Sequence, residues 1–159
     1  MKQLPIIAIA LMFISCNSSA QDKKESKEFP ITKTEAEWKA ELSEMEYYVL
    51  REEGTERPFS SELNKIYEPG TYVCAACETP LFEGKYKFDS GTGWPSFDRA
   101  IEGNVAYSTD TNLGYTRVEE HCATCGGHLG HVFEDGPKET TGKRHCINGA
   151  ALDFIPMKQ

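Results

Sequence analysis

The sequence has no run of lysine and arginine interleaved with aromatic residues, and basic residues are outnumbered along the whole chain. There are 17 lysine and arginine residues against 25 acidic ones, a formal net charge of −8. A chain of this charge repels a phosphate backbone, so we expect no nucleic-acid partner. Internal repeats and low-complexity tracts are also absent, and the 159 residues predict one compact domain once the ends are discounted.

No apolar run is long enough to span a bilayer as a permanent helix. Residues 4–14 are apolar and follow Met1-Lys2, which is typical of a signal-peptide core. The segment has two candidate ends: a lipoprotein box, in which Cys16 is lipidated, and a small-residue cleavage site at Ser18-Ser19-Ala20. We therefore predict a signal peptide over residues 1–20 and export to the periplasm, either free or as a membrane-anchored lipoprotein. Membrane contact is expected only through a lipid on Cys16.

Residues 21–33 are charged and lack apolar periodicity, which predicts a flexible linker, and the folded domain is expected over residues 34–157. Thr34 with Glu37, and Ser43 with Glu46, match the capping box that begins a helix. Two short helices are therefore expected, with Trp38, Leu42 and Met45 as an apolar stripe on the core.

From Tyr67 onward, short β-type runs alternate with glycine, proline, asparagine and aspartate. The predicted strands are residues 71–73, 86–88, 105–107, 115–118, 128–133 and 145–154. This pattern predicts a mainly β (α+β) fold, a small antiparallel β domain with two short N-terminal helices.

Four of the six cysteines form two Cys-x-x-Cys pairs, Cys74/Cys77 and Cys122/Cys125. Two such pairs can place four thiolates around one ion, so we predict a structural zinc site. Two local disulfides, or inert thiols in the core, are the alternatives. Cys146 then has no ligand role; a lone cysteine is usually a small buried hydrophobe, so its neighbours decide whether it is reactive.

The neighbours of Cys146 are polar. In an extended strand Arg144, Cys146 and Asn148 share one face, and the charge of Arg144 would favour the thiolate. Asn148 could orient a substrate oxygen or backbone. The alternative is that Arg144 is a solvated charge and Asn148 a turn residue.

A second candidate cluster holds two histidines, His128 and His131, around Gly130. In a regular strand they would face opposite ways, but Gly130 permits a bulge or bend that brings both imidazoles to one site. A metal-binding pair and ordinary structural histidines are the alternatives. With four cysteines available for zinc, proton transfer is the preferred interpretation.

A third motif is the loop of residues 88–97, where glycines surround Trp94. Such a loop can present an indole face, which suits a methyl or sulfur group because thioethers contact aromatic rings favourably. Ordinary packing is the alternative for a single tryptophan.

In their order along the chain, the motifs resemble peptide methionine sulfoxide reductases of the B type. They are Cys74-x-x-Cys77, Ser90-Gly-Thr-Gly-Trp-Pro-Ser-Phe97, Cys122-x-x-Cys125, His128-Leu-Gly-His-Val-Phe133, Asp135-Gly-Pro137 and Arg144-His-Cys-Ile-Asn148. The resemblance implies a β-rich fold around a structural zinc, and reduction of methionine R-sulfoxide in oxidised proteins or peptides with a thioredoxin-like reductant. We expect a monomer.

The resemblance also implies residue roles. Cys146 would be the nucleophile, with His128, His131 and Asn148 as the polar catalytic lining, and Trp94 would contact the substrate methyl group. Phe133, Arg144 and Asp135 would complete and support the substrate site. The attack would leave Cys146 as a sulfenic acid, which another thiol must reduce.

The chain departs from a common family pattern at Thr92, where many members carry a resolving cysteine. With four thiols assigned to zinc, no second free cysteine remains in the domain, so direct reduction by an external thiol is expected. The alternatives from other classes are a zinc-containing thiol-disulfide exchange protein and a zinc-ribbon binding module. Neither accounts for Cys146, the histidine pair and Trp94 together.

Overall fold

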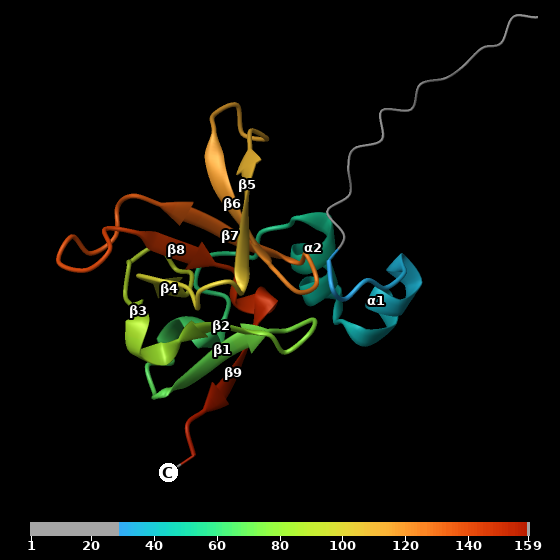
Figure 1. Cartoon of the computed structure of the whole chain (residues 1–159), viewed down its shortest axis with the longest axis horizontal. Helices are drawn as coiled ribbons and strands as arrows, with labels where there is room; N and C mark the ends of the chain where they lie inside the picture. The colour runs from blue at the N-terminus through green and yellow to red at the C-terminus, as the bar shows by residue number, and fades with distance from the viewer. Residues whose placement is uncertain (1–28, 159) are drawn as a thin grey trace, which may run out of the picture.

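The structure, a computed structural model, describes residues 29–158, which form two antiparallel sheets with two helices beside them (Figure 1). The predicted signal peptide, with its Cys16 box, and the first part of the predicted linker lie outside the described residues. Within residues 29–158 no helix is long and apolar enough to cross a membrane.

Both predicted helices are present, and each begins with its capping box. Helix α1 spans Glu35–Glu41 after Thr34, and α2 spans Glu44–Glu52 after Ser43. The predicted apolar stripe is only partly correct. Trp38 is buried and Leu42 is half-buried, but Met45 is 49% exposed, because the buried face of α2 carries Val49 and Leu50 instead.

The strands form one small and one large sheet, as the sequence predicted for a mainly β fold. The three-stranded sheet has the order β2-β1-β9, and the six-stranded sheet has the order β3-β4-β8-β7-β6-β5. The strand bounds are β1 Gly70–Cys74, β2 Pro80–Glu83, β3 Lys87–Phe88, β4 Ser96–Phe97, β5 Val105–Asp110, β6 Arg117–Cys122, β7 His128–Phe133, β8 Arg144–Ile147 and β9 Leu152–Pro156. Short 3-10 helices span Glu62–Lys65, Gly84–Tyr86 and Gly149–Ala151.

The single strand predicted over residues 145–154 is wrong. The 3-10 turn Gly149–Ala151 divides it into β8 and β9, which belong to different sheets. A buried polar side chain, Glu56, accepts the backbone N–H groups of Gly149 and Ala150 and stabilises this turn. The break leaves Cys146 near the end of β8.

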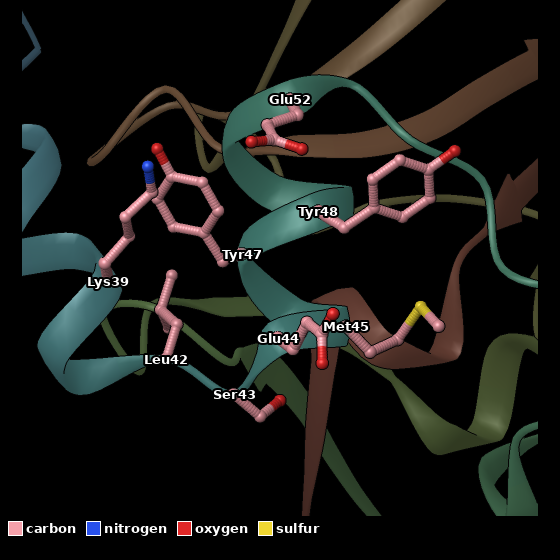
Figure 2. Close-up of a pocket in the computed structure, with 8 residues that line it drawn as sticks. All are labelled: Lys39, Leu42, Ser43, Glu44, Met45, Tyr47, Tyr48 and Glu52. Atoms are coloured by element: carbon pink, nitrogen blue, oxygen red, sulfur yellow. The ribbon is translucent and has the colours of Figure 1, made fainter.

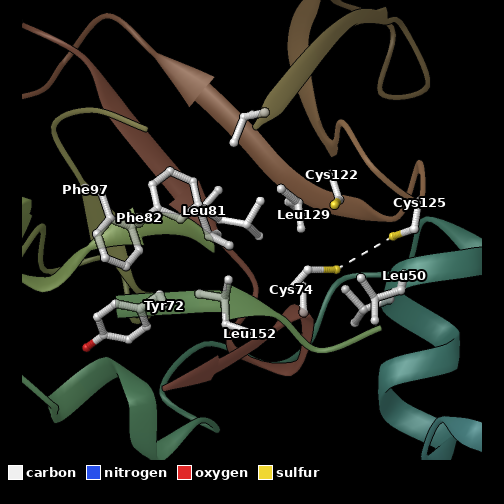
Figure 3. Close-up of a cluster of buried hydrophobic side chains, with 14 of the residues drawn as sticks. Leu50, Tyr72, Cys74, Leu81, Phe82, Phe97, Cys122, Cys125, Leu129 and Leu152 are labelled. Atoms are coloured by element: carbon white, nitrogen blue, oxygen red, sulfur yellow. Dashed lines mark hydrogen bonds between the residues drawn. The ribbon is translucent and has the colours of Figure 1, made fainter. Parts of the chain in front are cut away.

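The core lies between the two sheets and reaches α2 (Figure 3). Phe82 and Phe97 stack with ring centroids 4.5 Å apart, and Tyr72 meets Phe97 edge-on at 4.9 Å. At the other end of this core lie the sulfur atoms of Cys74, Cys122 and Cys125. The cysteine pairs are therefore part of the packing that joins the sheets.

Ordered contacts begin before Thr34, the predicted start of the domain. The backbone N–H of Ile31 donates to the carbonyl of Thr124 at 2.9 Å, and the ring of Phe29 lies against Gly126. The last residues of the predicted linker therefore pack on Thr124 and Gly126, on either side of Cys125.

Candidate functional site

Two cavities with different linings are candidates for the functional site. The larger, about 740 Å³, lies between α1 and α2 and is lined by Lys39, Leu42, Ser43, Glu44, Met45, Tyr47, Tyr48 and Glu52 (Figure 2). It has no cysteine or histidine. The smaller, about 140 Å³, is lined by Thr55, Trp94, Arg117, Gly130, His131, Phe133, Cys146 and Asn148. Size favours the first and chemistry favours the second, which holds the only half-exposed cysteine outside the four-cysteine group among the described residues.

Strand β8 places Cys146 between two other strands. Its direct partners are His131 on β7 and Ser96 on β4. Arg144 and Cys146 are both half-buried, whereas His145 and Ile147 are buried on the opposite face. The predicted alternation of side chains therefore holds along β8. The imidazole of His131 is therefore the cross-strand neighbour of the Cys146 thiol.

The surroundings of Cys146 do not make it an unusually acidic thiol. Burial raises the pKa of this thiol, and the nearby charge of Arg144 and the hydroxyl of Thr92 only partly oppose that effect. Arg144 favours the thiolate, as the sequence predicted, but burial outweighs it. The resting form of Cys146 at neutral pH is therefore the thiol.

The two imidazoles meet as predicted, because β7 carries a bulge. Gly130 pairs with Glu120 but His128 pairs with His121, so Leu129 is an extra residue in β7. The bulge puts His128 and His131 on the same face, with ring centroids 5.5 Å apart. Only His131 lines the cavity.

His131 is held by a carboxylate that sequence reasoning missed. Its Nε2 lies 2.7 Å from Oδ2 of Asp110, which also accepts Arg117 at 2.5 Å. Burial lowers the pKa of His131, although its hydrogen bond to Asp110 acts in the opposite direction. The pKa of Asp110 is lowered to about 2 by the backbone N–H of Asn112, followed by His131 and Arg117. Asp110 therefore stays ionised and fixes the orientation of a mostly neutral imidazole.

His128 lies deeper and is bonded to a second missed carboxylate. It is 3% exposed, and its Nδ1 lies 2.5 Å from Oε1 of Glu119. Burial opposes ionisation of Glu119, but the hydrogen bond from His128 and the neighbouring imidazoles lower its pKa overall. His128 thus supports His131 from behind rather than facing the cavity.

Trp94 and Asn148 are joined through one residue, Glu56. The indole N–H of Trp94 donates to the Glu56 carbonyl at 3.3 Å, and the Glu56 N–H donates to Asn148 Oδ1 at 3.1 Å. The amide nitrogen of Asn148 also donates to the carbonyl of Leu129 at 3.0 Å. Asn148 was predicted to orient a substrate oxygen or backbone. In the structure its side chain bonds to the protein's own backbone, at Glu56 and at Leu129, and so links these two segments to the end of β8.

Arg144 and Asp135 form a bidentate pair at the edge of the site. Arg144 donates to both carboxylate oxygens at 2.9 Å, and its guanidinium lies 4.5 Å from the ring centre of Phe133. This pair lowers the pKa of Asp135 and raises that of Arg144. Phe133 lines the cavity, whereas Asp135 is outside it and holds Arg144 beside the ring.

Thr92 stands where an intramolecular partner for Cys146 would be. Its Oγ1 lies 4.0 Å from the Cys146 sulfur. Ser90 Oγ is 2.8 Å from Thr92 Oγ1 and 2.8 Å from Ser96 Oγ, so three hydroxyls connect the loop to β4. This network fixes the loop that carries Trp94 against the strand beside Cys146.

The four remaining cysteines of the described residues form one cluster. Their sulfur atoms all lie within 4.8 Å of one another, with Cys74 3.7 Å from Cys125 and Cys77 3.5 Å from Cys122. All four are free thiols, which excludes the alternative of two local disulfides in this structure. The cluster can bind a metal ion, since sulfur atoms of both pairs converge on one point.

Two of the residues that sequence reasoning missed, Glu56 and Asp110, have partners that are distant in the chain. Glu56 meets Asn148 across 92 residues, and Asp110 meets His131 across 21. Acidic residues are numerous in this chain, and no local spacing distinguishes these two. Their pairing depends on strand register, which a pattern of single residues does not give.

The geometry agrees with comparisons to known proteins. The SelR domain family matches residues 42–156. The chain belongs to this family, that of the peptide methionine sulfoxide reductases of the B type. A relative from Chromohalobacter salexigens, named peptide methionine sulfoxide reductase MsrB, is 49% identical over 79% of this chain and 96% of its own length.

Further relatives with that name come from Alteromonas mediterranea and Thiobacillus denitrificans. The first is 51% identical over 84% of this chain and 91% of its own length, and the second 54% identical over 78% and 94%. Among solved structures, the Mis18 Yippee-like domain covers 58% of this chain and all of its own, with a TM-score of 0.47 and 14% identity. A likeness of that degree says nothing about function.

Proposed function

We propose that this chain reduces methionine R-sulfoxide in peptides and proteins, with Cys146 as the nucleophile. The observation that carries the assignment is the cavity in which Cys146, His131 and Trp94 meet. The Cys146 sulfur bonds to the sulfoxide sulfur as the sulfur–oxygen bond breaks, and the protonated oxygen leaves as water. Water then adds to the Cys146 sulfur, which breaks the sulfur–sulfur bond and leaves Cys146 as a sulfenic acid. Methionine is released, and the proton of the thiol balances the step.

His131 carries that proton. The sulfoxide oxygen must be protonated as its bond to sulfur breaks, and the thiol must lose its proton to attack. Because Cys146 is a thiol and His131 a neutral imidazole at rest, one transfer between them produces both the thiolate and the acid. His128 and Asp110 hold the ring in place.

Trp94 contacts the methyl group of the substrate and so determines which sulfoxide epimer binds. The cavity is closed on one side by the indole, whose face suits the methyl and sulfur of the substrate. Phe133 forms another apolar side, and the Arg144 guanidinium lies against its ring. A chiral pocket with the nucleophile on one wall accepts one sulfoxide configuration only.

The sulfenic acid is resolved by an external thiol. Thr92 supplies a hydroxyl rather than a thiol beside Cys146. A donor thiolate displaces hydroxide, which leaves as water, and forms a mixed disulfide with Cys146; a second donor thiol then releases the Cys146 thiol and the donor disulfide. A thioredoxin-like protein, with its own pair of cysteines, fits this role.

The metal held by the four cysteines is zinc in this proposal. The fit is chemical: four sulfur donors and no oxygen donor suit a closed tetrahedral zinc site. Cys74, Cys77, Cys122 and Cys125 would hold the ion, which would cross-link β1 to the loop after β6. It has no part in the reaction at Cys146.

An assay on dabsyl-methionine R- and S-sulfoxide with dithiothreitol tests the function directly. The R epimer is expected to be reduced and the S epimer left unchanged. Reduction of both epimers, or of neither, would contradict the assignment. The rival function, thiol-disulfide exchange by a Cys-x-x-Cys pair, predicts activity that survives Cys146→Ser and is lost in Cys122→Ser.

We also propose export, from the sequence of residues 1–20 alone. Intact-mass measurement of the mature protein distinguishes the versions. A lipid-bearing chain that begins at Cys16 supports the lipoprotein, a chain that begins at Gln21 without added mass supports a secreted form, and a chain that retains Met1 contradicts export.

A further inference from the structure

The turn at residues 57–60 places a bulky side chain where glycine is favoured. The Ser60 N–H donates to the Arg57 carbonyl at 3.2 Å, Pro58 occupies the second position, and Phe59 has φ +63° in the third. A proline followed by a residue of positive φ is the pattern of a type II turn, whose third position normally carries glycine or asparagine. An aromatic residue there is backbone strain.

Burial does not compensate for this strain. The ring of Phe59 is 64% exposed, so it contributes little to the core. Two other residues other than glycine have positive φ in the described chain, Glu53 and Glu78. Both are acidic side chains suited to solvent. Phe59 alone of the three presents a large apolar surface to water, and strain of this kind is concentrated at ligand-binding positions.

Phe59 is fixed against the loop of the active site. Its N–H donates to the Gly93 carbonyl at 2.7 Å, and its Cδ2 would lie 2.8 Å from a Cβ built on Gly93. The ring therefore rests on Gly93, the residue directly before Trp94. Only a glycine allows this approach, and its own φ is +92°.

The same segment reaches the cavity at its other end. Thr55 lines the cavity with Trp94 and Cys146, and Glu56 accepts the indole N–H of Trp94. The chain from Thr55 to Phe59 thus runs from the wall of the cavity to an exposed ring beside Trp94. A cavity of about 140 Å³ has room for the methionine sulfoxide side chain, so the neighbouring residues of a polypeptide would lie outside it, on the surface that Thr55 to Phe59 and the loop of Trp94 form.

We propose that Phe59 is a specificity-determining residue that binds an apolar side chain adjacent to methionine sulfoxide in a polypeptide substrate. The proposal rests on the proposed function of the cavity. An exposed aromatic face that is held rigid loses little entropy on contact, and it removes an aliphatic neighbour of the substrate from water. The substrate class is therefore a methionine sulfoxide with apolar flanking residues, as in a segment normally buried in a fold.

The test uses two peptides with methionine R-sulfoxide in the centre, one flanked by leucine and one by glycine, and compares kcat/KM. Wild-type protein should prefer the leucine-flanked peptide by roughly tenfold, the usual discrimination of an apolar contact. Phe59→Gly should abolish most of this ratio, mainly through KM, and Phe59→Leu should restore part of it.

Glycine accepts the left-handed backbone, so Phe59→Gly should retain the turn, and thermal unfolding checks that the variant is folded. Ile155→Ala, which removes an exposed apolar side chain on the other sheet, should keep the wild-type ratio.

Other results overturn the proposal. Equal loss on both peptides in Phe59→Gly would show that the ring only supports Trp94. A wild-type ratio near one would show that no apolar subsite exists. If wild-type protein reduced neither peptide, the proposed function itself would fail, which is a separate outcome.

Discussion

The hydroxyl oxygen of Thr92 lies 4.0 Å from the sulfur of Cys146, so the two side chains are in direct contact. Thr92 belongs to the loop that carries Trp94, and Cys146 belongs to β8. Serine hydroxyls fasten this loop to β4 through Ser90 and Ser96. The position is therefore suited to a group that reacts with the oxidised sulfur, and in this chain that group is not a thiol.

Thr92→Cys should convert the external resolution of the sulfenic acid into an internal one. The introduced sulfur would begin near the distance of the present contact and needs only a small loop movement to form a disulfide with Cys146. After one equivalent of substrate without reductant, peptide mapping should find this disulfide. Turnover with thioredoxin should exceed that of the wild type. Thr92→Ser, which keeps the hydroxyl, is the matched control and should form no such bond.

Without a resolving thiol, the unmodified protein should accumulate its sulfenic acid. A stoichiometric pulse of methionine R-sulfoxide without reductant is expected to give a dimedone adduct on Cys146 and no new internal disulfide. Cys146→Ser should give no adduct and should lose at least ~10³-fold of its activity, because the nucleophile is absent. Detection of a disulfide between Cys146 and any of the four clustered cysteines would overturn both the resolution scheme and the structural role of the metal.

The dependence of kcat/KM on pH should be a broad bell. The pKa of His131 is lowered from 6.5 and that of Cys146 is raised from 9.0, so the neutral imidazole and the thiol coexist between these values. Transfer of the thiol proton to His131 keeps the proton count of the pair constant, so the rate should be flat in this window. Below it His131 cannot accept the proton, and above it the acid is lost.

Asp110→Asn tests whether His131 sets the acid limb of this pH profile, because the direction in which the limb should move is known. The hydrogen bond from His131 to Asp110 raises the pKa of the imidazole, so its loss should move the acid limb to still lower pH. A pH profile on the dabsyl substrate measures the shift. Glu35→Gln, on exposed α1, should leave the limb in place. An acid limb that did not move in Asp110→Asn would remove His131 as the proton carrier.

Local patterns predicted much of this fold because the chain supplies them in short segments. The capping boxes at Thr34 and Ser43 start both helices, and the alternation around Cys146 correctly placed Arg144 on its face and His145 on the other. The glycine at 130 pointed to a bulge that does join His128 and His131 on one side. In each case the signal and its consequence lie within a few residues.

The failures have a common cause in long-range packing. Met45 fits the helical stripe, but it is exposed because the core contacts of α2 fall on Val49 and Leu50 instead. The run from His145 to Phe154 looks continuous, yet Glu56, about ninety residues earlier, caps the turn that divides it. The effect of Arg144 on Cys146 was correct in sign but smaller than the effect of burial, which only the folded structure gives.

Metal removal should lower the stability of the protein, and activity should fall only as a consequence of that loss. Cys77→Ser is expected to reduce zinc from one ion per chain to none and to cost at least about 3 kcal/mol, or roughly 10 °C in the unfolding midpoint, because metal-binding energy at such a site is folding energy. Elemental analysis and thermal unfolding measure the two effects. Cys146→Ser should keep both the zinc and the midpoint. Purified wild-type protein with two disulfides and no metal would contradict the site.

Glu56 should prove as important to the site as the residues that line it. It is 5% exposed, and its carboxylate accepts the N–H groups of Gly149 at 2.6 Å and Ala150 at 3.0 Å, directly after Asn148. Glu56→Ala leaves two backbone donors without an acceptor and should cost about 2 to 4 kcal/mol in urea unfolding. Glu56→Gln keeps one carbonyl acceptor and should recover roughly half of that loss. Glu83→Ala, which removes an exposed partner of Lys85, should change stability by less than ~1 kcal/mol. If Glu56→Ala unfolds as the wild type does, the turn that ends β8 is held by other contacts, and Glu56 does not fix the position of Asn148.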